Sequence, residues 1–128
     1  MEYTFHRTVP GSFDEVVSRV TEALKAEGFG VLSDIDVQAT LKAKLGEDFR
    51  PYRILGACNP PLAHKALSNE PRVGVMLPCN VVVQQTGEQQ VEVAAINPAA
   101  PMQAIGNPAL DSVATEVGTR LSRVVASL

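Results

Sequence analysis

The chain has 128 residues, of which 45% are hydrophobic, 20% charged and 5% aromatic, and its formal net charge is -3. This length is typical of one domain with one core, so we expect residues 1–128 to form a single domain. The 11 basic residues are scattered and aromatic side chains are few, which argues against a nucleic-acid partner. No apolar run reaches the ~20 residues of a membrane span or resembles a signal peptide, so we expect a cytoplasmic protein with no membrane partner.

The opening of the chain predicts a strand followed by an amphipathic helix. Residues 3–7 form the candidate strand, which the Pro10-Gly11 turn ends. Ser12 begins the helix, because its side chain and that of Glu15 can each bond the other's free backbone N–H group. Gly28 ends the helix, since glycine readily adopts the left-handed cap conformation. The apolar residues between these ends share one face: Phe13, Val16, Val17, Val20 and Leu24.

The next segment predicts a second strand and a short helix. Residues 30–35 have the composition of a strand, and Asp34 or Asp36 can cap the helix that follows. This helix ends before Gly46. Its apolar residues recur every four positions: Val37, Leu41 and Leu45.

The middle of the chain predicts a third strand, over residues 52–57, and another helix directly after it. Asn59 and Pro60 begin this helix. Asparagine is a strong helix cap, and proline fits the first helical position because its missing N–H group would have no partner there.

The second half of the chain predicts more strands. Residues 72–77 could form one, which Pro78 interrupts because proline cannot donate to a sheet ladder. Residues 80–85 and 90–96 flank Thr86-Gly87-Glu88, and this arrangement predicts a β-hairpin.

The chain ends in a predicted loop, over residues 97–101, and a last helix that begins at Asn107-Pro108. The order of elements favours an α+β fold, a two-layer sandwich in which helices pack on one face of a mainly antiparallel sheet. Because the other sheet face needs cover, we expect a homodimer. The apolar stripe of the last helix comprises Leu110, Val113, Val117, Leu121, Val124 and Leu128.

Both cysteines stand directly before an asparagine, as Cys58-Asn59 and Cys79-Asn80. In a reducing compartment their thiols are expected to stay free. Cys58 precedes a predicted helix N-terminus, where partial positive charge stabilises a thiolate. Gly56, two positions earlier on the same strand face, could leave room for a ligand. Burial as small apolar side chains is the alternative for both cysteines.

The same thiols could contribute to a metal site. The paired Cys-x-x-Cys spacing that is typical of structural zinc is absent. His64 points away from the buried face of its predicted helix, and His6 lies on the opposite strand face from Phe5, so the ligand directions converge poorly. Cys58, Cys79 and His64 are therefore weak metal candidates. Two thiolates completed by a carboxylate, or a site across a dimer interface, are the alternatives.

Residues 54–60 (ILGACNP) and 77–83 (LPCNVVV) resemble the bacterial and archaeal family known as domain of unknown function 302. The likeness covers nearly the whole chain, since the other predicted strands and helices follow in the expected order. This resemblance implies a compact two-layer α+β domain that forms a dimer. It implies no settled biochemical activity.

Three functions of different classes fit these observations. We favour a homodimeric domain that binds a small molecule or a metal ion near Gly56, Cys58, Asn59, Cys79 and Asn80. The first alternative is a thiol-dependent enzyme or redox protein, with Cys58 as nucleophile and Cys79 as resolving thiol. The second is an interaction module whose cysteines only support the fold. The sequence identifies no catalytic residue and no cofactor.

Overall fold

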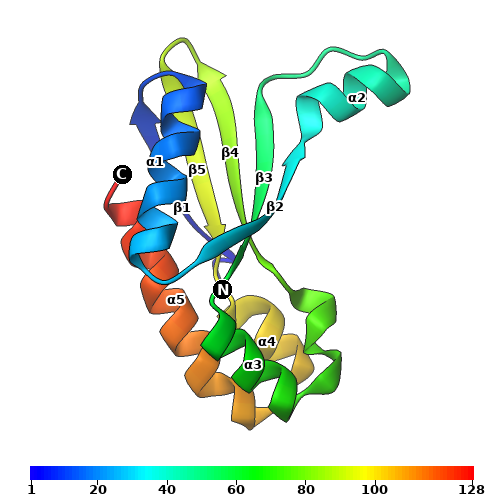
Figure 1. Cartoon of the computed structure of the whole chain (residues 1–128), viewed down its shortest axis with the longest axis vertical. Coiled ribbons are helices and arrows are strands. Elements are labelled where there is room, and N and C mark those ends of the chain that lie inside the picture. Colours follow the sequence, from blue (N-terminus) through cyan, green and yellow to red (C-terminus); the bar gives the residue numbers. More distant parts are fainter.

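The computed structural model describes residues 1–128 and contains one five-stranded sheet with the strand order β1-β5-β4-β3-β2 (Figure 1). Each strand runs antiparallel to its neighbours. This arrangement confirms the predicted α+β class. The strands are β1 (Thr4–Pro10), β2 (Gly30–Asp36), β3 (Tyr52–Cys58), β4 (Cys79–Gly87) and β5 (Gln90–Ile96).

Two long helices cover one face of the sheet. They are α1 (Phe13–Ala26) and α5 (Asp111–Ala126), which lie side by side in Figure 1. Their predicted apolar stripes are buried against the sheet, and none of the helices in the chain has both the length and the apolar surface for a bilayer crossing. The core residues of the two layers include Val16, Val20, Leu24, Val117 and Leu121 from the helices and Leu55, Val81, Val83, Val91 and Val93 from the sheet.

Ser12 and Gly28 end α1 as the sequence predicts, although the side chain of Glu15 does not return a hydrogen bond to the Ser12 N–H group. The Ser12 hydroxyl oxygen accepts a hydrogen bond from the Glu15 N–H group over 3.3 Å. Gly28 has a φ of +86°, a conformation that side chains rarely adopt. The Phe29 N–H group then bonds the Leu24 carbonyl over 2.9 Å, and the Phe29 side chain is buried. The chain therefore enters β2 at a defined angle.

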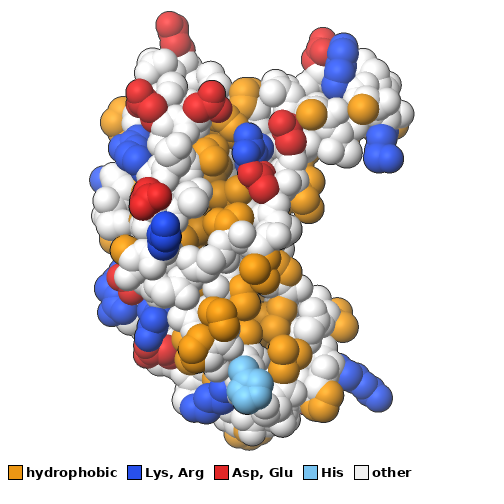
Figure 2. Space-filling model, viewed as in Figure 1, with side chains coloured by type: hydrophobic (Ala, Val, Ile, Leu, Met, Phe, Trp, Pro, Cys, Tyr) orange, Lys and Arg blue, Asp and Glu red, His pale blue; other side chains and the backbone are white.

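The short helix α2 (Val37–Leu45) projects away from the rest of the molecule (Figure 1 and Figure 2). Asp36 caps it by accepting from the Ala39 N–H group over 2.9 Å, and Gly46 ends it with a φ of +67°. No residue of α2 is buried, and Leu45 is 67% exposed. The apolar residues of this helix therefore have no core of their own to pack against.

Two predictions in the second half of the chain are wrong. Residues 72–77 do not form a strand, because Pro71–Met76 forms the 3-10 helix η1, in which Val73 is buried and Val75 is 85% exposed. The helix α3 (Pro60–Asn69) leads directly into it. The predicted loop at residues 97–101 is also partly helical, since α4 spans Ala99–Ile105.

The β4–β5 hairpin and the start of the last helix follow the predictions closely. The ladder closes with Gly87 opposite Gln90, and Gln89 takes a φ of 55° in the turn. Asn107 accepts from the Ala109 N–H group over 3.0 Å and starts a short 3-10 turn (Pro108–Leu110) that continues into α5.

The sheet face opposite α1 and α5, which we call the open face, has an apolar row across β2, β3, β4 and β5 that ends at His6 on β1. Strand register places Ile54 beside both Ile35 and Val82, and Ala94 beside both Val82 and His6. Ile35 is 49% exposed, and Ile54, Val82 and Ala94 are only partly buried. Polar residues flank the row on the same face, among them Thr4, Tyr52, Asn80, Gln84 and Glu92.

Candidate functional site

The two Cys-Asn motifs meet at one end of the sheet. In the β3–β4 ladder Ala57 lies opposite Cys79, and Gly56 lies opposite Asn80. The strand β3 ends at Cys58, where the chain turns into α3, and β4 begins at Cys79. Pairing of these two strand ends therefore brings both motifs to the same end of the sheet, where both cysteines line one cavity.

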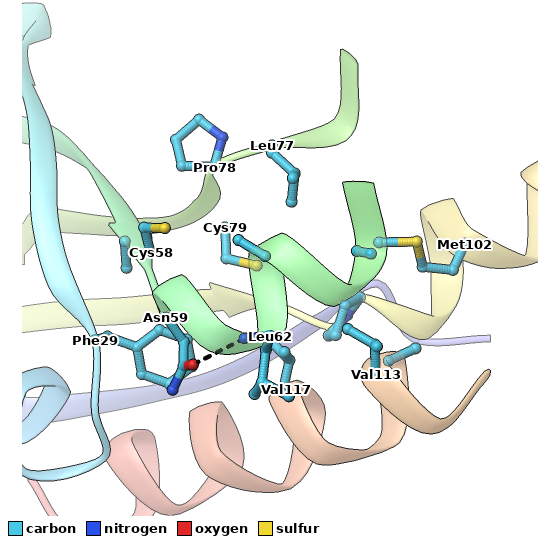
Figure 3. A pocket seen from close by; sticks show the side chains of 15 residues that line it. Phe29, Cys58, Asn59, Leu62, Leu77, Pro78, Cys79, Met102, Val113 and Val117 are labelled. Carbon is cyan, nitrogen blue, oxygen red and sulfur yellow. Dashed lines mark hydrogen bonds between the residues drawn. The ribbon is translucent and has the colours of Figure 1, made fainter. Parts of the chain in front are cut away.

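A cavity of about 50 Å³ lies between this end of the sheet and the helices α3, α4 and α5 (Figure 3). Twelve of its 15 lining residues are hydrophobic. A water molecule needs roughly 10–15 Å³ of such volume, and a benzene-sized ligand needs a cavity nearer to 150 Å³. The cavity therefore fits a small apolar group. Its walls include Phe29, Cys58, Asn59, Leu62, Cys79, Met102 and Val117.

Cys58 is half-buried directly before the first turn of α3. Asn59 caps this helix, since its Oδ1 atom accepts from the Leu62 N–H group over 3.2 Å, and Pro60 occupies the first turn. The predicted cap is thus confirmed. Asn59 is only 8% exposed and is the one polar residue of the buried core, so it gives the cavity wall an amide group.

Cys79 lies on the helix-covered side of the sheet and packs against the core. Burial raises the pKa of its thiol to about 11, and the neighbouring Cys58 adds to this shift. At neutral pH the Cys79 side chain is therefore a protonated thiol. This state disfavours the redox alternative, because a resolving cysteine attacks as a thiolate.

Gly56 and Asn80 do not contribute to the cavity. The room predicted above Gly56 is absent, because a Cβ atom there would overlap the Ser33 hydroxyl oxygen and lie 2.7 Å from the Pro78 ring. Asn80 is exposed on the open face, where it lies near Val82. Of the five residues predicted for the pocket, the structure brings together Cys58, Asn59 and Cys79.

The metal-binding candidates separate in the same way. His64 is exposed on α3, and His6 lies on the open face with its Nδ1 atom 3.0 Å from the Thr4 hydroxyl oxygen. The structure forms no group of three or more His, Cys, Asp or Glu side chains that could hold a metal ion. No carboxylate of the same chain lies with the two cysteines in the cavity wall.

The sequence analysis missed several residues of the cavity wall. Met102 comes from α4, where no helix was predicted, and Phe29 directly follows the helix end at Gly28. Val113 and Val117 belong to the predicted stripe of α5, so their burial was foreseen. Nothing in the local sequence connects these four residues to the thiols.

The fold and the cavity define a small α+β domain with an apolar site at the end of an antiparallel sheet. The chain belongs to the family described as "Domain of unknown function DUF302", whose model matches residues 5–128. This result confirms the resemblance seen in the sequence. A solved structure of an uncharacterized conserved DUF302 protein from Bacillus stearothermophilus is similar, with 35% identity, a TM-score of 0.84 and coverage of 95% of this chain and 96% of that one. No curated protein matches the chain.

Proposed function

We propose that the protein is a homodimeric binding domain that holds a small ligand in the cavity between its two Cys-Asn motifs. One observation carries the proposal: side chains from both motifs line a single, mostly apolar cavity. Ligand sites in proteins are typically concave and apolar, with a few polar groups that orient the ligand. Cys58, Asn59 and Cys79 provide those groups here.

The cavity wall defines the kind of ligand that fits. No Asp, Glu, Lys, Arg or His side chain lines the cavity, so a charged organic group would lose its hydration without a partner. The Asn59 Oδ1 atom is used by the helix cap, and its Nδ2 atom lies close to Gly28. The expected ligand therefore inserts a small, uncharged group beside the two sulfur atoms.

A cavity-filling variant tests this proposal. Ala63 on α3 lines the cavity, so Ala63→Leu should occupy it, whereas Ala43→Leu adds the same side chain to the exposed surface of α2. Native mass spectrometry of untagged protein purified under reducing conditions should show a retained ligand in the wild type and in Ala43→Leu, and none in Ala63→Leu. Equal retention in all three proteins would place the ligand elsewhere.

The open face supports the homodimer. A sheet of five strands, each about seven residues long, presents roughly 500 Å² on one face at the usual strand spacing. Two copies in contact would bury about 1,000 Å², the lower end of specific interfaces. Ile54, Val82 and Ala94 provide an apolar centre and polar residues surround it, as in typical interfaces.

A charge placed in the apolar row tests the dimer. Val82→Glu should convert the dimer to a monomer, because the carboxylate would be buried without a partner. Val75→Glu is the matched control, since Val75 is 85% exposed on η1. Light scattering after size exclusion measures the mass of each protein. A monomeric wild type, or a Val82→Glu protein that stays dimeric, would contradict this use of the open face.

A further inference from the structure

The cavity opens to the surface at the side formed by α3 and the segment that enters β4. The wall residues contributed by α4 and α5 are buried, whereas all partly exposed wall residues come from the opposite side. Figure 3 shows Leu77 and Pro78 on one side of the cavity and Val113 and Val117 on the other. A ligand therefore enters between the partly exposed wall residues Cys58, Leu62, Ala63, Leu77, Pro78 and Cys79.

An apolar patch continues from this opening over the surface of α3 and η1. Leu67 follows Ala63 by one helical turn, so the two side chains share a face of α3. A Cβ atom on Gly74 would lie 3.7 Å from Leu67, so the Leu67 side chain packs beside η1. Figure 2 shows hydrophobic side chains gathered at this end of the molecule. The outer patch, as we call it, consists of Leu67, Val75 and Met76, which are 42%, 85% and 41% exposed.

The size of the cavity determines where the rest of a ligand lies. At about 50 Å³ the cavity is smaller than the roughly 150 Å³ that holds a benzene ring, so most atoms of a ligand stay outside it. Apolar atoms of the ligand are stabilised there by contact with the outer patch. The three side chains of the patch are far fewer than the roughly 20–30 residues that each partner contributes to a protein interface. A single hydrocarbon chain matches the cavity and the patch together.

A free cation lies beside the outer patch. Side chains three residues apart in a 3-10 helix lie over one another, so Arg72 shares a face of η1 with Val75. Arg72 is exposed and takes part in none of the four ion pairs of the chain. Glu70, the one acidic residue of this region, is half-buried and accepts a hydrogen bond from the Asn107 Nδ2 atom over 3.3 Å. The guanidinium group is therefore available to a carboxylate.

We propose that the cavity and the outer patch bind one fatty acid per chain. The methyl end of its hydrocarbon chain enters the cavity, the middle of the hydrocarbon chain lies on the outer patch, and the carboxylate pairs with Arg72 at the surface. This inference rests on the proposed function and names the ligand class for the same cavity. The methyl end is uncharged, as the cavity wall requires, and the carboxylate stays in contact with water.

Isothermal titration calorimetry with dodecanoate, below the concentration at which it forms micelles, tests the assignment. The wild type should bind one dodecanoate per chain, and octanoate should bind about tenfold or more weakly because fewer methylene groups leave water. Val75→Glu should weaken dodecanoate binding by about tenfold, since a carboxylate replaces the apolar contact and competes for Arg72. Leu45→Glu is the control, because Leu45 is 67% exposed on α2, and it should match the wild type. A wild type that does not bind dodecanoate, or unchanged affinity in Val75→Glu, would overturn the inference.

The place of the carboxylate is tested with a ligand of opposite charge. The wild type should bind dodecanoate more tightly than dodecyltrimethylammonium, and Arg72→Gln should lose this preference. Lys65→Gln is the matched control and should keep the preference, because Lys65 is also exposed but its Nζ atom lies 3.4 Å from the Ser112 hydroxyl oxygen on α5. A preference that persists in Arg72→Gln would overturn the assignment of the carboxylate to Arg72.

The cavity-filling variant separates this inference from the proposed function. Dodecanoate binding should be lost in Ala63→Leu together with any ligand that the wild type retains. If dodecanoate does not bind but Ala63→Leu loses a retained ligand, only the fatty-acid assignment fails. If Ala63→Leu changes neither dodecanoate binding nor any retained mass, both fail. Sedimentation with phosphatidylglycerol vesicles that Val75→Glu abolishes, in a protein that does not bind dodecanoate, would identify the outer patch as a bilayer contact and overturn the inference.

Discussion

The guanidinium group of Arg120 on α5 donates a hydrogen bond to the carbonyl oxygen of Glu27, at the end of α1, over 3.0 Å. The next turn of α5 adds Arg123, which binds the Glu27 carboxylate over 2.9 Å. These contacts join the two covering helices at the point where Gly28 turns the chain toward Phe29, a residue of the cavity wall. One end of the cavity is thus positioned by a contact between the two helices.

Replacement of Arg120 should weaken this contact between α1 and α5. In Arg120→Met the Glu27 carbonyl loses a charged donor, so we expect the free energy of unfolding to fall by about 1–3 kcal/mol in urea titrations. Arg123→Met is the control, and it should have a smaller effect because its ion pair is exposed to solvent. An Arg123→Met protein that is less stable than Arg120→Met would contradict this ranking.

The close packing of Ser33 and Pro78 around Gly56 leads to a second prediction. Gly56→Ala forces a Cβ atom against the Ser33 hydroxyl and the rigid Pro78 ring, so it should destabilise the fold by about 1–3 kcal/mol. Gly30→Ala introduces the same methyl group on β2, where no atom lies within 4 Å, and should change stability little. Chemical denaturation of the two variants measures the difference. Equal midpoints would show that Ser33 and Pro78 move aside freely.

The buried thiol of Cys79 predicts a pH dependence of stability. Its pKa is raised to about 11 in the folded chain, so the folded form keeps a proton that the unfolded form loses near pH 8.5. This contribution to stability is fully present below about pH 8.5 and is lost as the pH rises toward 11, by about 3 kcal/mol in total.

Urea titrations at pH 8 and pH 10.5 check this dependence in a Cys58→Ser background. Replacing Cys79 by Ala in the same background removes the thiol and leaves the other titrating groups in place. The stability difference between the two proteins should therefore shift in favour of Cys79→Ala at the higher pH. A difference that does not change with pH would indicate a thiol with an ordinary pKa.

The cap of α3 gives a fourth prediction, which separates two roles of Asn59. Asn59→Ala removes the acceptor for the Leu62 N–H group and should cost about 0.5–2 kcal/mol of stability. Asn59→Ser keeps a cap but removes the amide Nδ2 group, so it should be more stable than Asn59→Ala. Ligand retention in the serine variant, measured by native mass spectrometry, then reports on the amide alone.

Signals within a single element predicted the helix ends well. Ser12, Gly28 and Asn59 act through their immediate neighbours, and each forms the cap that the sequence indicates. The missed helix α4 also has a local cause, in its prolines. In α4 both Pro98 and Pro101 lie where a helix start needs no N–H donor, so a segment that reads as a loop is helical.

The cavity required information that no local pattern contains. The two Cys-Asn motifs meet because Ala57 pairs with Cys79, and this register is set by contacts between distant segments. Met102 arrives from a third segment of the chain. The outward position of Asn80 could have been predicted, since neighbouring residues of a strand point to opposite faces and Cys79 was expected to be buried.

The helix α2 has a further consequence for the motion of the chain. A nine-residue helix with no buried side chain is held mainly by its own hydrogen bonds and caps, and isolated helices of this length are marginal in water. Its amide protons should therefore exchange with solvent through local opening, whereas those of β4 and β5 should exchange only through global unfolding. The chain would then consist of two parts with separate stabilities, one for the sheet and its covering helices and one for α2.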